Sequence, residues 1–368
     1  MAKSRLHELA EHGQSVWIDS LSRQWLRDGT LAKLIEEDAV VGVTSNPTIF
    51  QKALSEGDWY DDQLRELLGQ EDDPREIFWH LAVADVVEGC DVLRPIWDGG
   101  KGQDGYVSLE VDPDIAYDQQ ATIDQAMRLH EWVDRPNLFV KIPATEPGLG
   151  AIEESIARGK SINVTLIFSL ARYEAVAEAY IRGLERLVES GGDPTKVASV
   201  ASFFVSRVDT ETDRRLDEVG QPGLKGKLAV ANAKLAYERY KAIFSGPRWE
   251  ALAAGGATTQ RCLWASTSTK NPEYRDVMYV EELIGPATVN TMPLETIRAF
   301  QDHGEIRGDT IEEGVGEAHV LLEELARVGI DYDDVVDTLE REGVQKFSDS
   351  LAELLEGINA KKGELVSA

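Results

Sequence analysis

The chain has 368 residues, and 38 Lys and Arg against 66 Asp and Glu give it a formal charge of −28. Such a charge repels polyanions, which argues against nucleic acid or an anionic membrane as a partner. A hydrophobic content of 42%, with 8 Trp, is typical of a folded chain and excludes intrinsic disorder.

Short apolar runs rich in β-branched residues alternate along the chain with longer amphipathic stretches. The first run, 15–20, predicts a strand, and 21–37 predicts the helix that follows it. Further strands are expected over 40–44, 106–111, 138–142, 162–167, 197–205, 261–265 and 287–290. Between them, helical periodicity marks 170–189, 224–244 and 294–302.

This alternation, repeated roughly eight times, predicts an α/β fold with a parallel sheet covered by helices. Runs that are apolar throughout, such as Val-Val-Gly-Val at 40–43, are typical of strands buried on both faces. The simplest interpretation is a (β/α)8 TIM-type barrel with additional helices, and an open doubly wound sheet is the alternative. We expect one barrel domain over 1–368, with 310–368 a C-terminal helical extension packed on the barrel.

Cysteine content and the absence of long apolar runs indicate the cellular compartment. Its two cysteines, Cys90 and Cys262, cannot form a disulfide framework. The first 20 residues lack the apolar stretch of a signal peptide, and no apolar run approaches the ~18 residues of a membrane span. We therefore expect a cytoplasmic protein with no membrane partner.

Two glycine motifs resemble nucleotide-binding loops. Residues 100–105 match G-x-G-x-x-G, but a strand follows them where a dinucleotide site needs a helix, so we interpret them as a flexible loop. In the second motif, ending at 159–161, Glu154 stands where a phosphate loop needs its first glycine. The six histidines have no ligand spacing. We predict neither a nucleotide site nor a metal site.

Polar residues mark the carboxyl ends of the expected strands. In a parallel barrel these ends share one rim, where catalytic groups gather. The residues at or just beyond these ends are Asp19, Asn46, Glu110, Lys141, Asn163, Thr165, Ser202, Arg207 and the segment 266–270. The pattern predicts a site that combines two carboxylates, a lysine, several amides and hydroxyls, and a pair of cations.

Lys141 is the most informative of these residues because it interrupts an apolar strand, Leu-Phe-Val-Lys-Ile. Alternation places it on the same face as Phe139. Burial disfavours an ammonium ion and lowers its pKa, and the neutral amine can attack a carbonyl carbon to form a Schiff base. The alternative is a salt-bridged lysine at a strand end. The polar residues around it favour the catalytic interpretation.

The other candidates also have structural alternatives. Asp19 and Glu110 would move protons during Schiff-base chemistry, or would be ordinary caps and ion pairs. Asn46 precedes Pro47, a pair that favours a turn ahead of a helix.

The two cations have a joint interpretation. Arg207 would pair with Asp209 or Glu211, or it would join Lys270 at the neighbouring strand end. An acidic protein needs such local cations to hold a phosphate group.

At these residues the chain resembles the transaldolase family. Gly-Val-Thr-Ser-Asn-Pro-Thr-Ile-Phe at 42–50 is similar to the family's N-terminal signature. Leu-Phe-Val-Lys-Ile-Pro-Ala-Thr-Glu-Pro-Gly at 138–148 is similar to the segment around its Schiff-base lysine. The segments 107–112, 162–169 and 201–207 resemble further family strands in the same order, so the likeness runs from about residue 15 to 290.

The resemblance implies a transferase of the non-oxidative pentose phosphate pathway that needs no cofactor or metal. It would transfer a dihydroxyacetone unit from sedoheptulose 7-phosphate or fructose 6-phosphate to glyceraldehyde 3-phosphate or erythrose 4-phosphate. Its partners would be sugar phosphates, and the chain would act as a monomer or a homodimer.

The resemblance also assigns roles. Lys141 would form the imine with the ketose C2 carbonyl, and Asp19 would remove the C4 hydroxyl proton. Glu110, through a water held with Thr165, would handle protons as the carbinolamine forms and dehydrates.

Binding roles follow in the same way. Asn46, Asn163 and Ser202 would hold the hydroxyls of the enamine. Arg207 would bind the phosphate with Lys270 beside it, although many relatives carry an arginine in that segment. A lysine is a point charge without the arginine fork. We assign no family motif to the segments 51–105 and 210–260, which would carry oligomer contacts or merely elaborate helices.

Two other hypotheses remain open from sequence. A Schiff-base sugar-phosphate aldolase would use the same lysine but release the three-carbon fragment to water. A catalytically silent barrel would only bind sugar phosphates, yet binding alone does not require an amine in an apolar strand.

Overall fold

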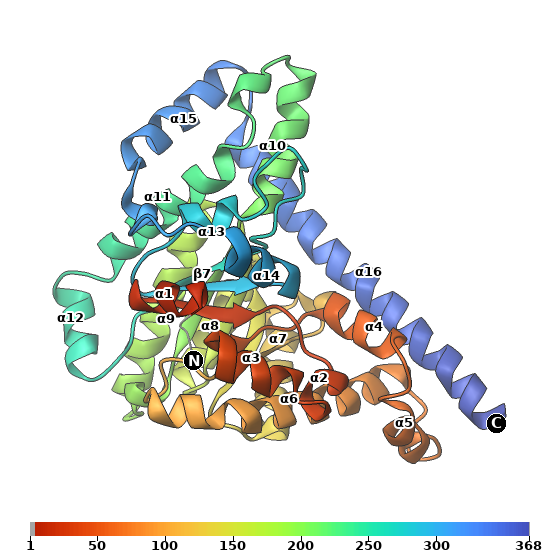
Figure 1. Cartoon of the computed structure of the whole chain (residues 1–368). Helices are drawn as coiled ribbons and strands as arrows, with labels where there is room; N and C mark the ends of the chain where they lie inside the picture. Colours follow the sequence, from red (N-terminus) through yellow and green to blue (C-terminus); the bar gives the residue numbers. More distant parts are fainter. Residues whose placement is uncertain (1–3, 368) are drawn as a thin grey trace.

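A computed structural model describes residues 4–367 of the chain, which form eight strands (Figure 1). The strands are β1 (Gln14–Ile18), β2 (Val40–Val43), β3 (Val107–Glu110), β4 (Leu138–Pro143), β5 (Ile162–Ile167), β6 (Ser199–Phe204), β7 (Arg261–Ala265) and β8 (Thr288–Met292).

Helices occupy the connections between the strands. The first eight are α1 (Arg5–Glu11), α2 (Arg23–Arg27), α3 (Thr30–Asp38), α4 (Pro47–Ser55), α5 (Asp61–Leu67), α6 (Pro74–Gly99), α7 (Gln119–Val133) and α8 (Glu146–Ala157). The others are α9 (Leu170–Glu189), α10 (Ser206–Glu218), α11 (Leu228–Ile243), α12 (Pro247–Ala254), α13 (Met278–Glu282), α14 (Leu294–His303), α15 (Val315–Arg327) and α16 (Tyr332–Ser367).

The strands close into a parallel barrel in chain order, with β8 paired to β1. Closure confirms the (β/α)8 TIM-type prediction and excludes the open doubly wound sheet. Because all strands run the same way, their carboxyl ends lie on one rim, as the prediction of the site required.

The helix predicted over 21–37 is wrong as a single element. Gly29 adopts φ +83°, in the left-handed region that glycine enters without strain, and it separates α2 from α3. The Asp28 carboxylate fixes the break by accepting a hydrogen bond from the Thr30 N–H at 2.9 Å. Similarly, α11 begins at Leu228 and not at residue 224, because Gly226 has φ +70°.

The amino-terminal end of the barrel is closed by an ionic plug. Arg261, on β7, donates to the Ser15 hydroxyl at 2.9 Å and to Asp104 at 3.1 Å. Asp104 also accepts from the Trp17 indole at 3.0 Å. Asp104 belongs to the glycine-rich loop 100–105, so hydrogen bonds to β1 and β7 anchor this loop at Asp104. The flexibility of the rest of the loop stays a prediction.

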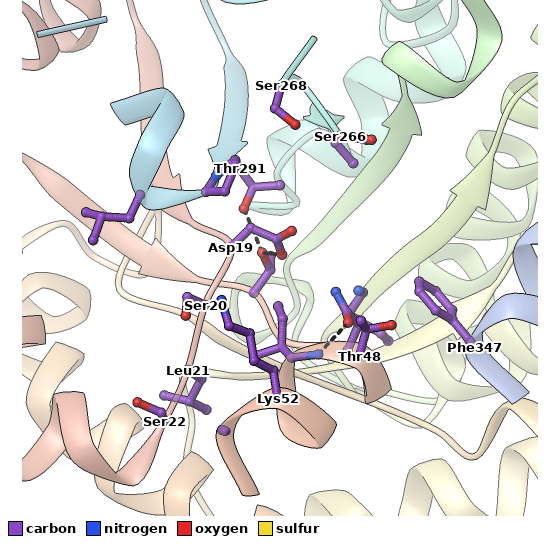
Figure 2. Close-up of a pocket in the computed structure, with 18 of the residues that line it drawn as sticks. Asp19, Ser20, Leu21, Ser22, Thr48, Lys52, Ser266, Ser268, Thr291 and Phe347 are labelled. Carbon is purple, nitrogen blue, oxygen red and sulfur yellow. Dashed lines mark hydrogen bonds between the residues drawn. The ribbon is translucent and has the colours of Figure 1, made fainter. Parts of the chain in front are cut away.

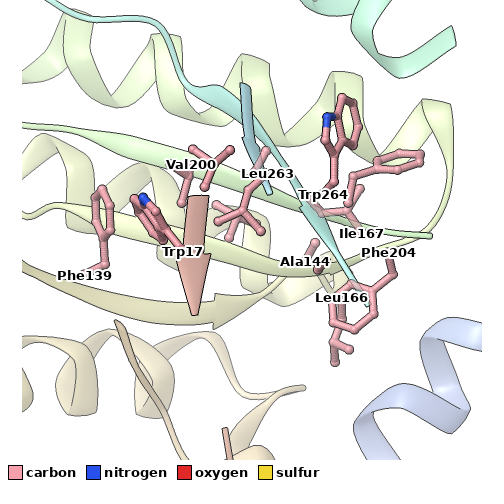
Figure 3. Packing of buried hydrophobic residues seen from close by; sticks show 14 of the residues in the cluster. Trp17, Phe139, Ala144, Leu166, Ile167, Val200, Phe204, Leu263 and Trp264 are labelled. Atoms are coloured by element: carbon pink, nitrogen blue, oxygen red, sulfur yellow. The ribbon is translucent and has the colours of Figure 1, made fainter. Parts of the chain in front are cut away.

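Above the plug, large apolar side chains fill the barrel. Trp17 and Phe139 pack with ring centroids 6.1 Å apart, and Figure 3 shows them beside Val200 and Leu263. Gly42 makes room for this layer, because a Cβ there would lie 2.5 Å from the Trp17 ring. This close-packed layer supports the polar residues of the rim from below.

The C-terminal helices are present as predicted, and α16 packs against α4, α6 and α10. In Figure 1, α16 is the long blue helix that runs past α4 and α5. It approaches the barrel closely at Gly343, where a Cβ would lie 3.0 Å from the Leu166 side chain and 3.5 Å from Arg207 Nη1. This contact brings residues from the end of the chain to the rim.

Among residues 4–367, no helix combines the length and the apolar character that a membrane crossing requires.

Candidate active site

A cavity of about 520 Å³ opens at the carboxyl ends of the strands. Most of the residues predicted from strand ends line it. These are Asp19, Asn46, Lys141, Thr165, Ser202, Arg207 and Lys270. Glu110 and Asn163 are not among the residues that line it and lie next to those that do.

Strand register sets the geometry around Lys141. Glu110 on β3, Lys141 on β4 and Asn163 on β5 are direct partners across the two ladders. Register partners in a parallel sheet point to the same side, so these three side chains form one layer inside the barrel. Lys141 and Glu110 are 5% and 4% exposed.

The Lys141 ammonium group contacts two oxygen atoms. Its Nζ lies 3.1 Å from Glu110 Oε2 and donates a hydrogen bond to the Ser45 carbonyl at 3.1 Å. Burial raises the pKa of Glu110, while the positive charge of Lys141 acts in the opposite direction. Because a buried carboxylate is costly, Glu110 can accept a proton from the ammonium group and leave a neutral amine.

Asp19 follows β1 and is held by a chain of hydroxyl groups. Thr44 Oγ1 donates to Asp19 Oδ1 at 2.7 Å and lies 2.6 Å from Thr291 Oγ1. Since Thr44 has one hydroxyl proton and gives it to Asp19, Thr291 must be the donor in the second bond. Burial raises the pKa of Asp19, and the charge of Lys141 lowers it. Figure 2 shows Asp19 beside Thr291.

Sequence reasoning missed Thr44 and Thr291. Both line the cavity. The sequence shows a threonine just beyond β2 and another inside β8. Threonine is also common in strands as an ordinary β-branched residue, so its presence did not point to a function.

The side chain of Asn46 fits both of its predicted roles, as a residue that begins a helix and as a ligand-binding group. Its Oδ1 caps α4 by accepting from the Ile49 N–H at 3.0 Å. The same side chain lines the cavity, so its amide nitrogen is available to a ligand there.

Asn163 and Ser202 are linked to each other. The Ser202 hydroxyl donates to Asn163 Oδ1 at 2.7 Å, and Asn163 Nδ2 donates to the Ser108 hydroxyl at 3.0 Å. Ser202 lines the cavity while Asn163 is fully buried next to it. Asn163 therefore orients Ser202 Oγ, whose lone pairs remain available to accept a hydrogen bond from the cavity.

Thr165 and Glu110 carry free hydrogen-bonding capacity. Neither Thr165 Oγ1 nor Glu110 Oε1 has a hydrogen-bond partner within residues 4–367. Thr165 lies on β5 beyond Asn163 and lines the cavity above the Lys141 layer. Buried polar atoms of this kind need a partner, and a bound ligand or a water can supply one.

Arg207, in the first turn of α10, does not use the carboxylates proposed as its structural partners. Asp209 accepts from the Ala229 N–H and the Tyr279 hydroxyl, at 2.8 Å each. Glu211 pairs with arginines of its own helix. The alternative of a purely local ion pair for Arg207 is therefore wrong.

Aromatic rings hold the Arg207 guanidinium. Its Cζ lies 5.1 Å from the centroid of Phe204 and 5.8 Å from that of Phe347 on α16. Figure 2 shows Phe347 projecting from α16 towards the cavity. Burial lowers the pKa of Arg207, which still leaves an arginine charged at neutral pH.

Lys270 lies near Arg207, as expected. Its Nζ donates to Ser268 Oγ at 2.6 Å, and desolvation lowers its pKa. Lys346 of α16 also lines the cavity and was not predicted, because a lysine on a long polar helix carries no sequence signal of its own.

Groups of three or more His, Cys, Asp or Glu that could hold a metal ion are absent from the described part of the chain.

Comparison with known proteins adds an independent observation. Residues 16–358 match the family model described as transaldolase/fructose-6-phosphate aldolase. The chain is 54% identical to a transaldolase of Frankia alni over 97% of both chains. It is 56% identical to a transaldolase of Acidothermus cellulolyticus, over 95% of this chain and 94% of the relative. A Streptomyces avermitilis protein named transaldolase 2 is 52% identical, over 97% and 96%.

Proposed function

The chain belongs to the transaldolase family, and from that premise we propose which of its residues carry out each step of the transfer. The protein is a transaldolase, a transferase of the pentose phosphate pathway whose substrates are sugar phosphates. It moves a dihydroxyacetone unit from sedoheptulose 7-phosphate or fructose 6-phosphate to glyceraldehyde 3-phosphate or erythrose 4-phosphate through a lysine Schiff base. The observation that carries the residue assignment is the ion pair of Lys141 and Glu110 beside a cavity lined by Asp19.

Lys141 is the nucleophile of the first step. Its ammonium group gives a proton to Glu110, and the neutral amine adds to the C2 carbonyl of the ketose to form a carbinolamine. Glu110 then returns a proton to the C2 hydroxyl, which leaves as water and gives the iminium ion. A water between Glu110 and Thr165 would carry these protons, because both side chains have unused hydrogen-bonding atoms there.

Asp19 is the base of the second step. Its carboxylate removes the proton from the C4 hydroxyl, the C3–C4 bond breaks, and the electron pair of that bond neutralises the iminium as an enamine. The aldehyde product leaves with its phosphate. Addition of an acceptor aldehyde reverses the sequence, with Asp19 returning its proton to the new alkoxide.

Retention of the enamine separates transfer from simple cleavage. Asn46 and Ser202 would hydrogen-bond the hydroxyls of the three-carbon fragment, with Asn163 orienting Ser202 from beneath. Arg207 and Lys270 would bind the phosphate of donor and acceptor at the mouth of the cavity.

An acceptor-dependence assay tests this function. We expect the purified protein to convert fructose 6-phosphate and erythrose 4-phosphate into sedoheptulose 7-phosphate and glyceraldehyde 3-phosphate, with little turnover when the acceptor is omitted. Release of free dihydroxyacetone at a comparable rate without acceptor would instead support the aldolase, which the family description also includes.

Location and assembly are further proposals. The enzyme would work in the cytoplasm, because phosphorylated sugars are too highly charged to cross a membrane unaided. The chain would act as one barrel domain with 310–368 as its extension, either as a monomer or as a homodimer. Light scattering would distinguish these two states.

A further inference from the structure

Three neighbouring cations line one cavity without a carboxylate partner. They are Arg207 of α10, Lys270 in the β7–α13 connection and Lys346 of α16. No ion pair within residues 4–367 includes any of them, although the chain carries 66 acidic residues against 38 basic ones. Elsewhere on α16, by contrast, Lys361 pairs with Asp61 at 2.7 Å.

The position of Lys346 follows from the way α16 meets the barrel. Gly343, Lys346 and Phe347 lie at i, i+3 and i+4 and so share one face of the helix. Gly343 makes the close approach to Arg207 described above, and Phe347 is 3% exposed with its ring near the Arg207 guanidinium. Lys346, whose side chain is exposed, therefore lies at the edge of the helix face held against Arg207 and lines the cavity there.

The three charges act on one another. The positive charge of Arg207 is the leading cause of a lowered pKa at Lys346, and Lys270 adds to it. Negative charges also act on this group: Glu295 and Asp19 on Lys270, and Glu110, Asp19 and Glu342 on Arg207. None of these carboxylates forms an ion pair with any of the three cations within residues 4–367. Such repulsion is relieved when a dianion binds among the cations.

We propose that Lys346 is a third phosphate ligand of this transaldolase, so that the C-terminal helix contributes directly to its selectivity for phosphorylated substrates. The inference rests on the proposed function, which assigns phosphate binding to Arg207 and Lys270. It goes further in giving α16 a substrate-binding role. The phosphate group of a sugar phosphate has three terminal oxygens, and three donors from three separate segments can each take one.

Binding of inorganic phosphate to Lys346→Ala, measured by calorimetry, tests the inference without turnover. We expect Kd to rise about tenfold, the value of one charge-assisted hydrogen bond, and Lys346→Arg to restore most of the affinity. In the transfer assay, KM for fructose 6-phosphate should rise similarly while kcat changes little, because the contact is made in both ground and transition state.

Arg341→Ala is the matched control. It removes one positive charge from the exposed surface of the same helix at a residue that does not line the cavity. Its phosphate affinity should stay within about twofold of the parent protein, since exposed charges at a distance are screened.

Arg207→Ala distinguishes an error in the role of Lys346 from an error in the assignment of the phosphate site. If it weakens phosphate binding while Lys346→Ala binds as tightly as the parent, the role of Lys346 is wrong and the proposed function stands. If neither variant weakens binding, the assignment of the phosphate site itself is wrong. Equal losses in Lys346→Ala and Arg341→Ala would show general charge attraction and would also overturn the inference.

Discussion

Lys141 Nζ lies 3.1 Å from Glu110 Oε2, and the two residues are direct register partners on neighbouring strands. The pair holds a proton donor and a proton acceptor together inside the barrel. Its position follows from backbone pairing, which fixes it more firmly than loops could.

Glu110→Gln tests the role of this pair. Glutamine keeps the shape of the side chain but cannot take the proton of Lys141 or return one to the leaving water. We expect kcat to fall by about 10²–10⁴, the usual contribution of a general acid–base group. Rapid-quench measurement of imine formation should show the same loss, and an unchanged rate would exclude Glu110 from this step.

Asp19→Asn should separate imine formation from carbon–carbon cleavage. Asparagine cannot accept the C4 hydroxyl proton, so kcat should fall by about 10²–10⁴ while dihydroxyacetone still forms an imine. Burial raises the pKa of Asp19. As the pH is lowered, the parent protein should therefore lose activity at a higher pH than an enzyme whose base has the ordinary pKa of an aspartate.

Thr44→Val is the companion variant for Asp19. It removes one hydrogen bond to the carboxylate and leaves the base in place. A loss as large as that of Asp19→Asn would contradict the assignment of Asp19 as the base, because the base itself is still present.

Asp209 should make stability depend on pH. Burial raises its pKa from 3.8 to about 7, so the folded protein holds a proton that the unfolded chain has already lost. This contribution to stability is present below about pH 4 and is lost as pH rises through about 7, at up to about 1.4 kcal/mol per pH unit.

Asp209→Asn removes that titration while keeping an acceptor for the Ala229 N–H. Urea unfolding from about pH 5 to about pH 8 should show the variant gaining stability relative to the parent as pH rises. A difference in the free energy of unfolding that does not change with pH would refute the raised pKa.

Gly42→Ala should destabilise the barrel. The added Cβ would lie 2.5 Å from the Trp17 ring, which is fully buried and cannot retreat. We expect the free energy of unfolding to fall by about 1–3 kcal/mol, as for other overpacked cores. Gly29→Ala is a different test, because its Cβ would meet nothing within 4 Å and only its φ of +83° opposes the change.

The barrel could be predicted because its strands are short apolar runs that repeat with helices between them. Periodicity alone failed at Gly29, since the apolar pattern continues through a residue whose left-handed backbone ends the helix. Boundaries of this kind depend on single dihedral angles, which a hydrophobic pattern does not record.

Much of the candidate site could also be predicted, because parallel strands bring their ends together. Residues such as Lys141 and Thr165 needed only their place at a strand end. Lys346 could not be found in this way. It reaches the cavity only because α16 approaches Arg207 at Gly343, a tertiary contact with no local signature.

The segment 51–105, in which the sequence analysis identified no family motif, lies within the residues that the family model matches and shows the same limit. It contains Asp85, which lies 2.8 Å from Arg23 as a fully buried ion pair, and Tyr60, which donates to Asp85 at 2.7 Å and lines the cavity. The sequence offers an arginine and an aspartate on separate amphipathic helices. Their meeting depends on the packing of α2 against α6.

Borohydride trapping tests the central claim most directly. The protein would be incubated with fructose 6-phosphate, reduced with sodium borohydride and digested, and the modified peptide identified by mass spectrometry. We predict a reduced three-carbon or six-carbon adduct on Lys141, and no adduct in Lys141→Met. An adduct on another lysine, or none in a protein that catalyses the transfer, would contradict the assignment of Lys141 as the Schiff-base residue.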